Sequence, residues 1–78
     1  MLVKVQGFRQ MDFKGSDGKQ VKGTTLYASY PEDGVTGEVT DKFFIKPEVS
    51  IPKGVAIGKT LDIGFNRRGK VETIVLTD

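Results

Sequence analysis

The chain alternates between apolar and polar residues in five short runs, which predicts five β-strands. The runs cover residues 2–13, 20–30, 37–46, 59–66 and 70–76. No segment has the sustained spacing of an amphipathic helix. Glycine, proline and aspartate gather between the runs, as turn formers do in an all-β domain.

The third run carries the most informative alternation, because each of its two faces has a distinct composition. One face, which we expect to be buried, carries Val39, Asp41, Phe43 and Ile45. The other carries Thr40, Lys42, Phe44 and Lys46. A ring between two lysines suits a single-stranded nucleic acid, whose bases stack on aromatics and whose phosphates pair with cations. The alternative is a strand buried on both faces, with lysines that extend past the ring to water. A one-residue slip in register would exchange Phe43 and Phe44.

The same alternation assigns inward and outward residues in the other four runs. In the first run, Val3 and Val5 share one face, whereas Lys4, Gln6 and Phe8 share the other, and Gly7 marks a bulge or bend. The expected core residues of the second and fourth runs are Leu26, Ala28, Tyr30, Leu61, Ile63 and Phe65. This assignment turns Tyr27 outward. In the fifth run, Val71, Thr73 and Val75 alternate with Glu72, Ile74 and Leu76. Both faces are apolar near its end, so we expect a partner subunit to cover the side of Ile74 and Leu76.

Five strands with turns about every 8–12 residues predict one all-β domain over residues 1–78, a five-stranded Greek-key barrel of the OB type with a protruding hairpin. SH3-like barrels share the strand count and are the structural alternative. The longest connection follows Pro47, and in it we expect Val49 and Ile51 to anchor inward. Residues 55–58 then form a helical turn or a loop that plugs one end of the barrel.

Composition excludes most catalytic chemistry. The 78 residues contain neither cysteine nor histidine, and their ten carboxylates are scattered, so we expect no enzyme activity, metal or cofactor. The lack of cysteine fits a reducing cytoplasm. Residues 1–7 lack the apolar core of a signal peptide, and no run is long enough to span a membrane. We therefore expect a cytoplasmic protein that does not bind membranes.

Net charge is only +2, but the charges are segregated along the sequence. Three lysines flank the Asp17-Gly18 turn, which predicts a basic hairpin that follows a phosphate backbone. A second basic cluster lies at residues 67–70, and the acids Glu32, Asp33, Glu38 and Asp41 gather around an acidic loop at residues 30–37. The alternative is the ordinary charge scatter of a small soluble domain. The candidate nucleic-acid-binding residues are Phe8, Arg9, Lys14, Lys19, Lys22, Tyr27, Lys42, Phe44, Lys46, Arg67 and Arg68.

Several short motifs resemble those of the small single-stranded DNA-binding proteins of filamentous phages and related mobile elements. They are Gly18-Lys19 after the basic hairpin, Phe43-Phe44, the Ile51-Pro-Lys-Gly54 turn and a late hairpin tip at residues 66–69. The resemblance implies an OB-like fold, a homodimer, and cooperative, sequence-tolerant coating of single-stranded DNA during replication. Two positions depart from the family pattern: this chain has Val21 and the Arg67-Arg68 pair where family members carry aromatic residues. Those departures shift the expected stacking to Phe44 and Tyr27.

Two alternatives to DNA binding remain open at the level of sequence. The first is a small barrel that binds other proteins through Ile74, Leu76 and the acidic loop. The second is RNA binding by the same residues, which would differ only in recognition of the 2′-hydroxyl.

Overall fold

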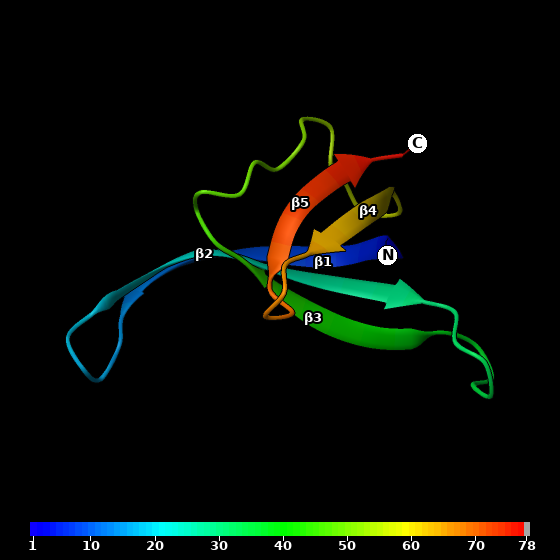
Figure 1. The fold of residues 1–78 in the computed structure, drawn as a ribbon, viewed down its shortest axis with the longest axis horizontal. Helices are drawn as coiled ribbons and strands as arrows, with labels where there is room; N and C mark the ends of the chain where they lie inside the picture. The colour runs from blue at the N-terminus through cyan, green and yellow to red at the C-terminus, as the bar shows by residue number, and fades with distance from the viewer. Residues whose placement is uncertain (78) are drawn as a thin grey trace.

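The computed structural model describes residues 1–77, which form five β-strands and no helix (Figure 1). The strands are β1 (Leu2–Lys14), β2 (Gln20–Tyr30), β3 (Val39–Ile45), β4 (Thr60–Phe65) and β5 (Val71–Leu76). They make one sheet in the order β3-β2-β1-β4-β5, and every adjacent pair is antiparallel. The prediction of an all-β chain with five strands is confirmed, and each strand lies within two residues of its expected run.

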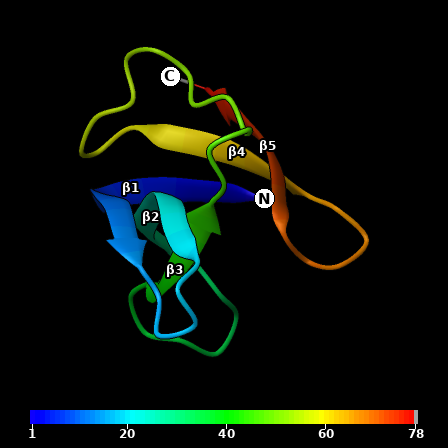
Figure 2. The ribbon, with the colours of Figure 1, turned by 90° about the vertical axis from the view of Figure 1, so that its left-hand side faces the viewer.

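The sheet curls but is not closed (Figure 2). β3 and β5 are its two edges, and neither is a hydrogen-bonded neighbour of the other. Beside this gap, the ring of Phe43 on β3 lies 5.9 Å from the ring of Phe65 at the end of β4. We call the gap the seam; its lining includes Lys42, Phe43, Lys46, Phe65 and Lys70. The backbone pairing therefore does not close the sheet into a barrel.

The core lies on the concave side of the curled sheet and consists of aliphatic residues from all five strands. Its buried members are Val3, Val5, Leu26, Ala28, Ile45, Leu61, Ile63, Val71 and Ile74. The connection between β3 and β4 packs against it through Val49 and Val55, as expected for Val49, whereas Ile51 is exposed. Residues 55–58 form no helical turn. Instead, the Gly58 N–H donates to the Val5 carbonyl and the Val5 N–H donates to the Lys59 carbonyl, both at 2.9 Å, which ties this loop to β1.

A β-bulge in β1 corrects the predicted face of Phe8. Val5 pairs with Ala28 and Gly7 pairs with Tyr27, so Gln6 is the extra residue. Beyond an extra residue the alternation is reversed. Phe8 therefore pairs with buried Leu26 on the inner face, rather than sharing the outward face of Gln6.

A second irregularity corrects the assignment of β5. Phe65 pairs with Val71 and Gly64 pairs with Thr73, so Glu72 has no direct partner on β4. As a result Val71 and Ile74 are both buried, and Leu76 packs against the same core. The side of Ile74 and Leu76 is thus turned inward in this chain and is not the exposed contact surface that the alternation predicted. Val75 is exposed instead.

The β1–β2 hairpin extends beyond the rest of the sheet (Figure 1), and we call residues 12–22 the wing. Its tip is held by short local hydrogen bonds: the Gly15 N–H donates to the Lys19 carbonyl at 2.7 Å, and the Lys19 N–H donates to Asp17 Oδ1 at 3.0 Å. Gly18 has a φ of 83°, which is a conformation that glycine adopts without strain.

Candidate nucleic-acid interface

The side of β1–β3 that faces away from the core carries aromatic, polar and basic side chains. In an antiparallel pair, directly opposed residues project to the same side of the sheet, so the register identifies them. We call this surface the outer face; it comprises Arg9, Met11, Phe13, Thr25, Tyr27, Lys42 and Phe44. None of these seven residues is acidic.

Two aromatic rings and two cations alternate across the centre of the outer face. Tyr27 is paired with Lys42, and Thr25 is paired with Phe44 on one side and Arg9 on the other. The exposed fractions of Tyr27 and Phe44 are 38% and 44%, so each ring is supported on one side and open to solvent on the other.

The exposed position of Phe44 confirms the predicted register of β3. Its neighbours in sequence face the opposite way: Ile45 is buried, and Phe43 is half-buried against the core. Phe43 and Phe44 have therefore not exchanged places by a one-residue slip.

Phe44 lies against the backbone at Gly23. A methyl group at Gly23 would lie 2.6 Å from Phe44 Cζ and 2.5 Å from the Ile45 carbonyl oxygen. Gly23 also has a φ of 151°, which residues with a side chain rarely adopt. Only glycine gives the ring this close seat on the sheet, which limits the positions that the Phe44 side chain can take.

A basic cluster continues from the outer face into the seam. Lys42 on β3 and Lys46 directly after it line the seam on one side, and Lys70, directly before β5, lines it on the other. The β4–β5 turn adds Arg67 and Arg68 around an adjoining hollow that also contains Lys46. Five cations from two distant parts of the sequence thus converge, and Glu72 is the acid in the lining of that hollow.

The Asn66 side chain holds the turn that presents the two arginines. Its Oδ1 accepts hydrogen bonds from the N–H groups of Arg68 at 2.9 Å and Lys70 at 3.1 Å. The Asn66 N–H in turn donates to the Lys70 carbonyl at 2.9 Å. Because these hydrogen bonds fix the backbone of the turn, the exposed side chains of Arg67 and Arg68 are available to bind an anion.

The lysines of the wing are all exposed, but they do not all belong to the outer face. Lys22 pairs with Asp12, and Lys14 pairs with Gln20. By the alternation along β1 and β2, these two pairs lie on the same side of the sheet as Phe8 and Leu26, which is the inner face. Near the base of the wing, Lys22 and Lys46 border a common hollow. The paired lysines of the wing therefore lie on the side opposite to the outer face, and Lys19 lies in the turn at the tip.

A cluster of acidic residues lies at the opposite end of β2. Glu32, Asp33 and Glu38 lie in the connection from β2 to β3, which Figure 1 shows far from the wing. Partial burial and the carboxylates of Asp41 and Glu32 raise the pKa of the Tyr30 hydroxyl, which donates a long hydrogen bond of 3.5 Å to Asp41 Oδ2. This end of the sheet is thus acidic, whereas the wing at the other end carries three lysines and two aspartates.

Of the predicted binding residues, the structure brings Arg9, Tyr27, Lys42 and Phe44 onto one face and adds Lys46, Arg67 and Arg68 at its border. It separates Phe8, Lys14 and Lys22 from this group by placing them on the opposite side of the sheet, and Lys19 lies in the turn of the wing. The sequence prediction missed Phe13, whose outward direction depends on the bulge, and Phe65, which was assigned to the core although it is exposed. Lys70 could have been included from its place beside the two arginines.

Among residues 1–77, no group of three or more acidic, cysteine or histidine side chains is placed to hold a metal ion. No helix in that range is long and apolar enough to cross a membrane. No known protein family, curated protein or solved structure matches this chain.

Proposed function

We propose that this chain binds single-stranded DNA without catalysis and with little sequence preference. The observation that carries the proposal is the register that puts Tyr27, Lys42 and Phe44 on one exposed, acid-free face. Aromatic rings that stack bases and cations that follow the phosphates are the two components of sequence-tolerant single-strand binding.

The spacing of the two rings supports binding of successive bases. Phe44 is opposite Thr25, and Tyr27 is two residues further along β2, so the rings are diagonal neighbours. Such neighbours are about 7–8 Å apart, which is too far for one base to stack on both. Each ring therefore takes its own base, with Lys42 and Arg9 beside the connecting phosphates.

The strand order supports an OB-type assignment. β1 pairs with β2 along most of its length and with β4 at its start, and so joins a three-stranded meander to the β4–β5 hairpin. In OB folds, the face of the second and third strands and the loops after the first and fourth strands bind oligonucleotides. Here those two loops are the wing and the Asn66–Lys70 turn, and both are basic.

The resemblance to the phage proteins also indicates a biological role for this binding. It supports a homodimer that coats and protects single-stranded DNA during the replication of a phage or mobile element.

Titration of fluorescently labelled oligo(dT) at two salt concentrations tests the proposal. With about five phosphate contacts, a fourfold rise in salt should weaken binding roughly 100-fold, since each contact contributes about 0.7 to the slope for single strands. Absence of binding at low salt, or binding that salt does not weaken, would contradict the proposal. Parallel titrations with oligo(rU) and with duplex DNA distinguish DNA, RNA and double-strand binding.

A further inference from the structure

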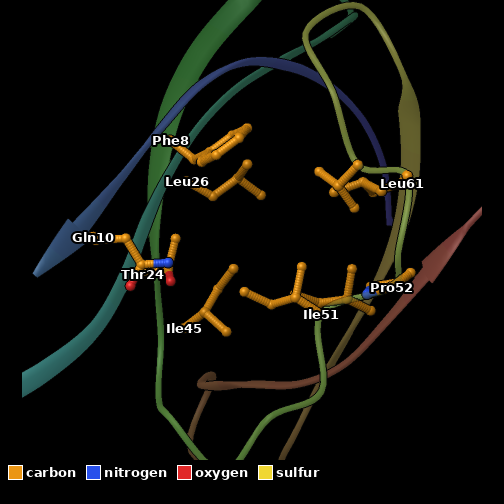
Figure 3. Close-up of a pocket in the computed structure, with 11 residues that line it drawn as sticks. Phe8, Gln10, Thr24, Leu26, Ile45, Ile51, Pro52 and Leu61 are labelled. Carbon is orange, nitrogen blue, oxygen red and sulfur yellow. The ribbon is translucent and has the colours of Figure 1, made fainter.

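An open pocket of about 260 Å³ lies on the inner face of the sheet, on the side opposite to Tyr27 and Phe44 (Figure 3). The phase reversal at the β1 bulge turns Phe8 toward it. Its walls are mainly apolar and include Phe8, Leu26, Ile45, Ile51, Leu61 and Ile74. Pockets for drug-sized ligands begin at about 300 Å³, so this volume suits one small ring system.

The Phe8 ring is the open wall of the pocket. It is 50% exposed although it pairs with the buried Leu26, and Figure 3 shows it beside Leu26 at the edge of the cavity. A half-exposed ring next to an apolar cavity offers a flat surface to a second aromatic group.

Two polar side chains stand together in the pocket lining. Gln10 and Thr24 are directly opposed in the β1–β2 ladder, and both contribute to the lining. The Gln amide both donates and accepts hydrogen bonds, and so does the Thr hydroxyl. Together they match the edge of a heterocycle that carries donors and acceptors side by side.

Two lysines lie directly outside the pocket. A second hollow shares Gln10, Thr24 and Ile51 with the pocket and is also bordered by Lys22 and Lys46. Asp12 is in the same hollow, but its Oδ1 accepts a 2.6 Å hydrogen bond from Gln20 Nε2. The site therefore runs from an apolar pocket, through a polar rim, to two lysines.

We propose that this pocket takes one nucleobase, with its phosphate held by Lys22 and Lys46. The base stacks on Phe8, and its hydrogen-bonding edge meets Gln10 and Thr24. The inference rests on the proposed function for the source of the base, because Lys46 also borders the seam beside Phe44. A strand that leaves Phe44 can pass Lys46 and place its next accessible base in the pocket.

The consequence is a base preference at one position within an otherwise sequence-tolerant site. Stacking on Tyr27 and Phe44 tolerates every base, whereas an amide and a hydroxyl next to an enclosed ring distinguish one pattern of donors and acceptors from another.

Binding of the four deoxynucleoside monophosphates, followed by NMR, tests the pocket directly. We expect one of the four to shift the methyl resonances of Ile51 and Leu26 more strongly than the others at equal concentration. The site is disproved if none of the four shifts those methyls, or if all four do so equally. These signals do not depend on the outer face, so a Phe44→Ala variant that has lost strand binding should keep them.

Two near-isosteric substitutions test the polar rim. Gln10→Leu and Thr24→Val should each weaken binding of the preferred nucleotide about threefold to tenfold, the range for one lost hydrogen bond, and leave the other three unchanged. Thr36→Val, on the exposed β2–β3 connection and outside both the pocket and the outer face, is the matched control and should change none of them. If both rim variants keep the wild-type ratios among the four nucleotides, the rim does not read the base. Gln10 is exposed, so its substitution remains informative if Thr24→Val does not fold.

Strand-borne and free nucleotides are distinguished by an oligo(dT) in which one residue is replaced by the preferred base. If the pocket serves the bound strand, this oligomer binds more tightly than plain oligo(dT), and Phe8→Leu reduces the difference. If free nucleotides shift the pocket methyls but the oligomers bind equally, the ligand is the free nucleotide. Strand binding that requires Phe44, with no response of the pocket to any nucleotide, would overturn this inference and leave the proposed function standing.

Discussion

The wing and the centre of the outer face share β1 and β2, but the core supports only the centre of the outer face. In the wing, residues 12–22, only Gly15 and Val21 are even partly buried, and the exposed side chains include three lysines and Phe13. On the outer face the core lies behind the sheet, and the side chains that stand out are Tyr27 and Phe44. The Tyr27 and Phe44 rings thus lie where the core supports the backbone, whereas the wing lysines lie where it does not.

This difference follows from what each contact needs. Stacking requires a ring held in a fixed plane, and close packing on a sheet limits its rotation. A lysine needs only reach, because Coulomb attraction acts over several ångströms and the flexible side chain adapts to the phosphate. Positions on the outer face should therefore be sensitive to small geometric changes, and positions in the wing only to charge.

The largest effect is expected at Gly23, where the wing joins the outer face. Gly23→Ala combines an unfavourable φ with a clash against Phe44 and the Ile45 carbonyl, which together should lower the free energy of unfolding by about 2–4 kcal/mol. Urea denaturation measures it. Gly18→Ala at the wing tip is the matched control: its φ is also positive, but no atom lies within 4 Å of the added methyl, so the cost should be about 1 kcal/mol. Equal costs at the two glycines would show that Phe44 does not depend on the Gly23 seat.

The next effect separates the two neighbouring phenylalanines. Phe44→Ala should weaken oligo(dT) binding by about 1–3 kcal/mol, the contribution of one stacked base, while changing stability by less than about 1 kcal/mol. Phe43→Ala should do the reverse and reduce stability by about 2 kcal/mol, because Phe43 packs on the core and against Phe65. Anisotropy titrations and thermal denaturation of both variants give the answer. Loss of folding in the Phe44 variant alone would assign that ring to the core.

The smallest effect for a single substitution is expected in the wing. Lys19→Ala should reduce the slope of log affinity against log salt by about 0.7 and leave stability unchanged, because it removes one phosphate contact on an exposed turn. Lys19→Arg should retain the slope, since charge rather than shape is needed there. Lys53→Ala, in the β3–β4 connection, is the control and should alter neither quantity. A change in the Lys53 slope equal to that of Lys19 would indicate diffuse attraction rather than a wing contact.

Alternation in the sequence predicted faces correctly wherever a strand pairs without interruption. β3 is such a strand, and both the burial of Ile45 and the exposure of Phe44 follow directly from its pattern. The same holds for Leu26 and Tyr27 on β2.

The predictions were wrong where a strand carries an extra residue. Gly7 indicated a bulge, but its presence alone does not say which neighbour is unpaired, and Phe8 was placed on the wrong face as a result. In β5 the extra residue is Glu72, which is not a glycine and gives no local signal, so the burial of Ile74 was missed. The position of a bulge depends on how the strand pairs with its partner, and the partner strand lies elsewhere in the sequence.

The basic residues of the seam could be identified from the sequence, but their convergence in space could not be predicted from it. Lys42 and Lys70 are far apart in the chain, and they meet only because β3 and β5 are the two edges of one curled sheet. Local patterns predict strands, whereas the order of strands in a sheet depends on long-range pairing.

The open seam also has a mechanical meaning. A closed ring of strands can widen only by breaking ladder hydrogen bonds, whereas β3 and β5 are not paired here, and side-chain packing that includes Phe43 on β3 and Phe65 at the end of β4 holds this side of the sheet. The two edges can therefore separate while all four strand ladders remain intact, at the expense of side-chain packing in the core and at the seam. Lys42, Lys46 and Lys70 gather at the same seam, so the part of the sheet that no ladder closes also carries a cluster of positive charge.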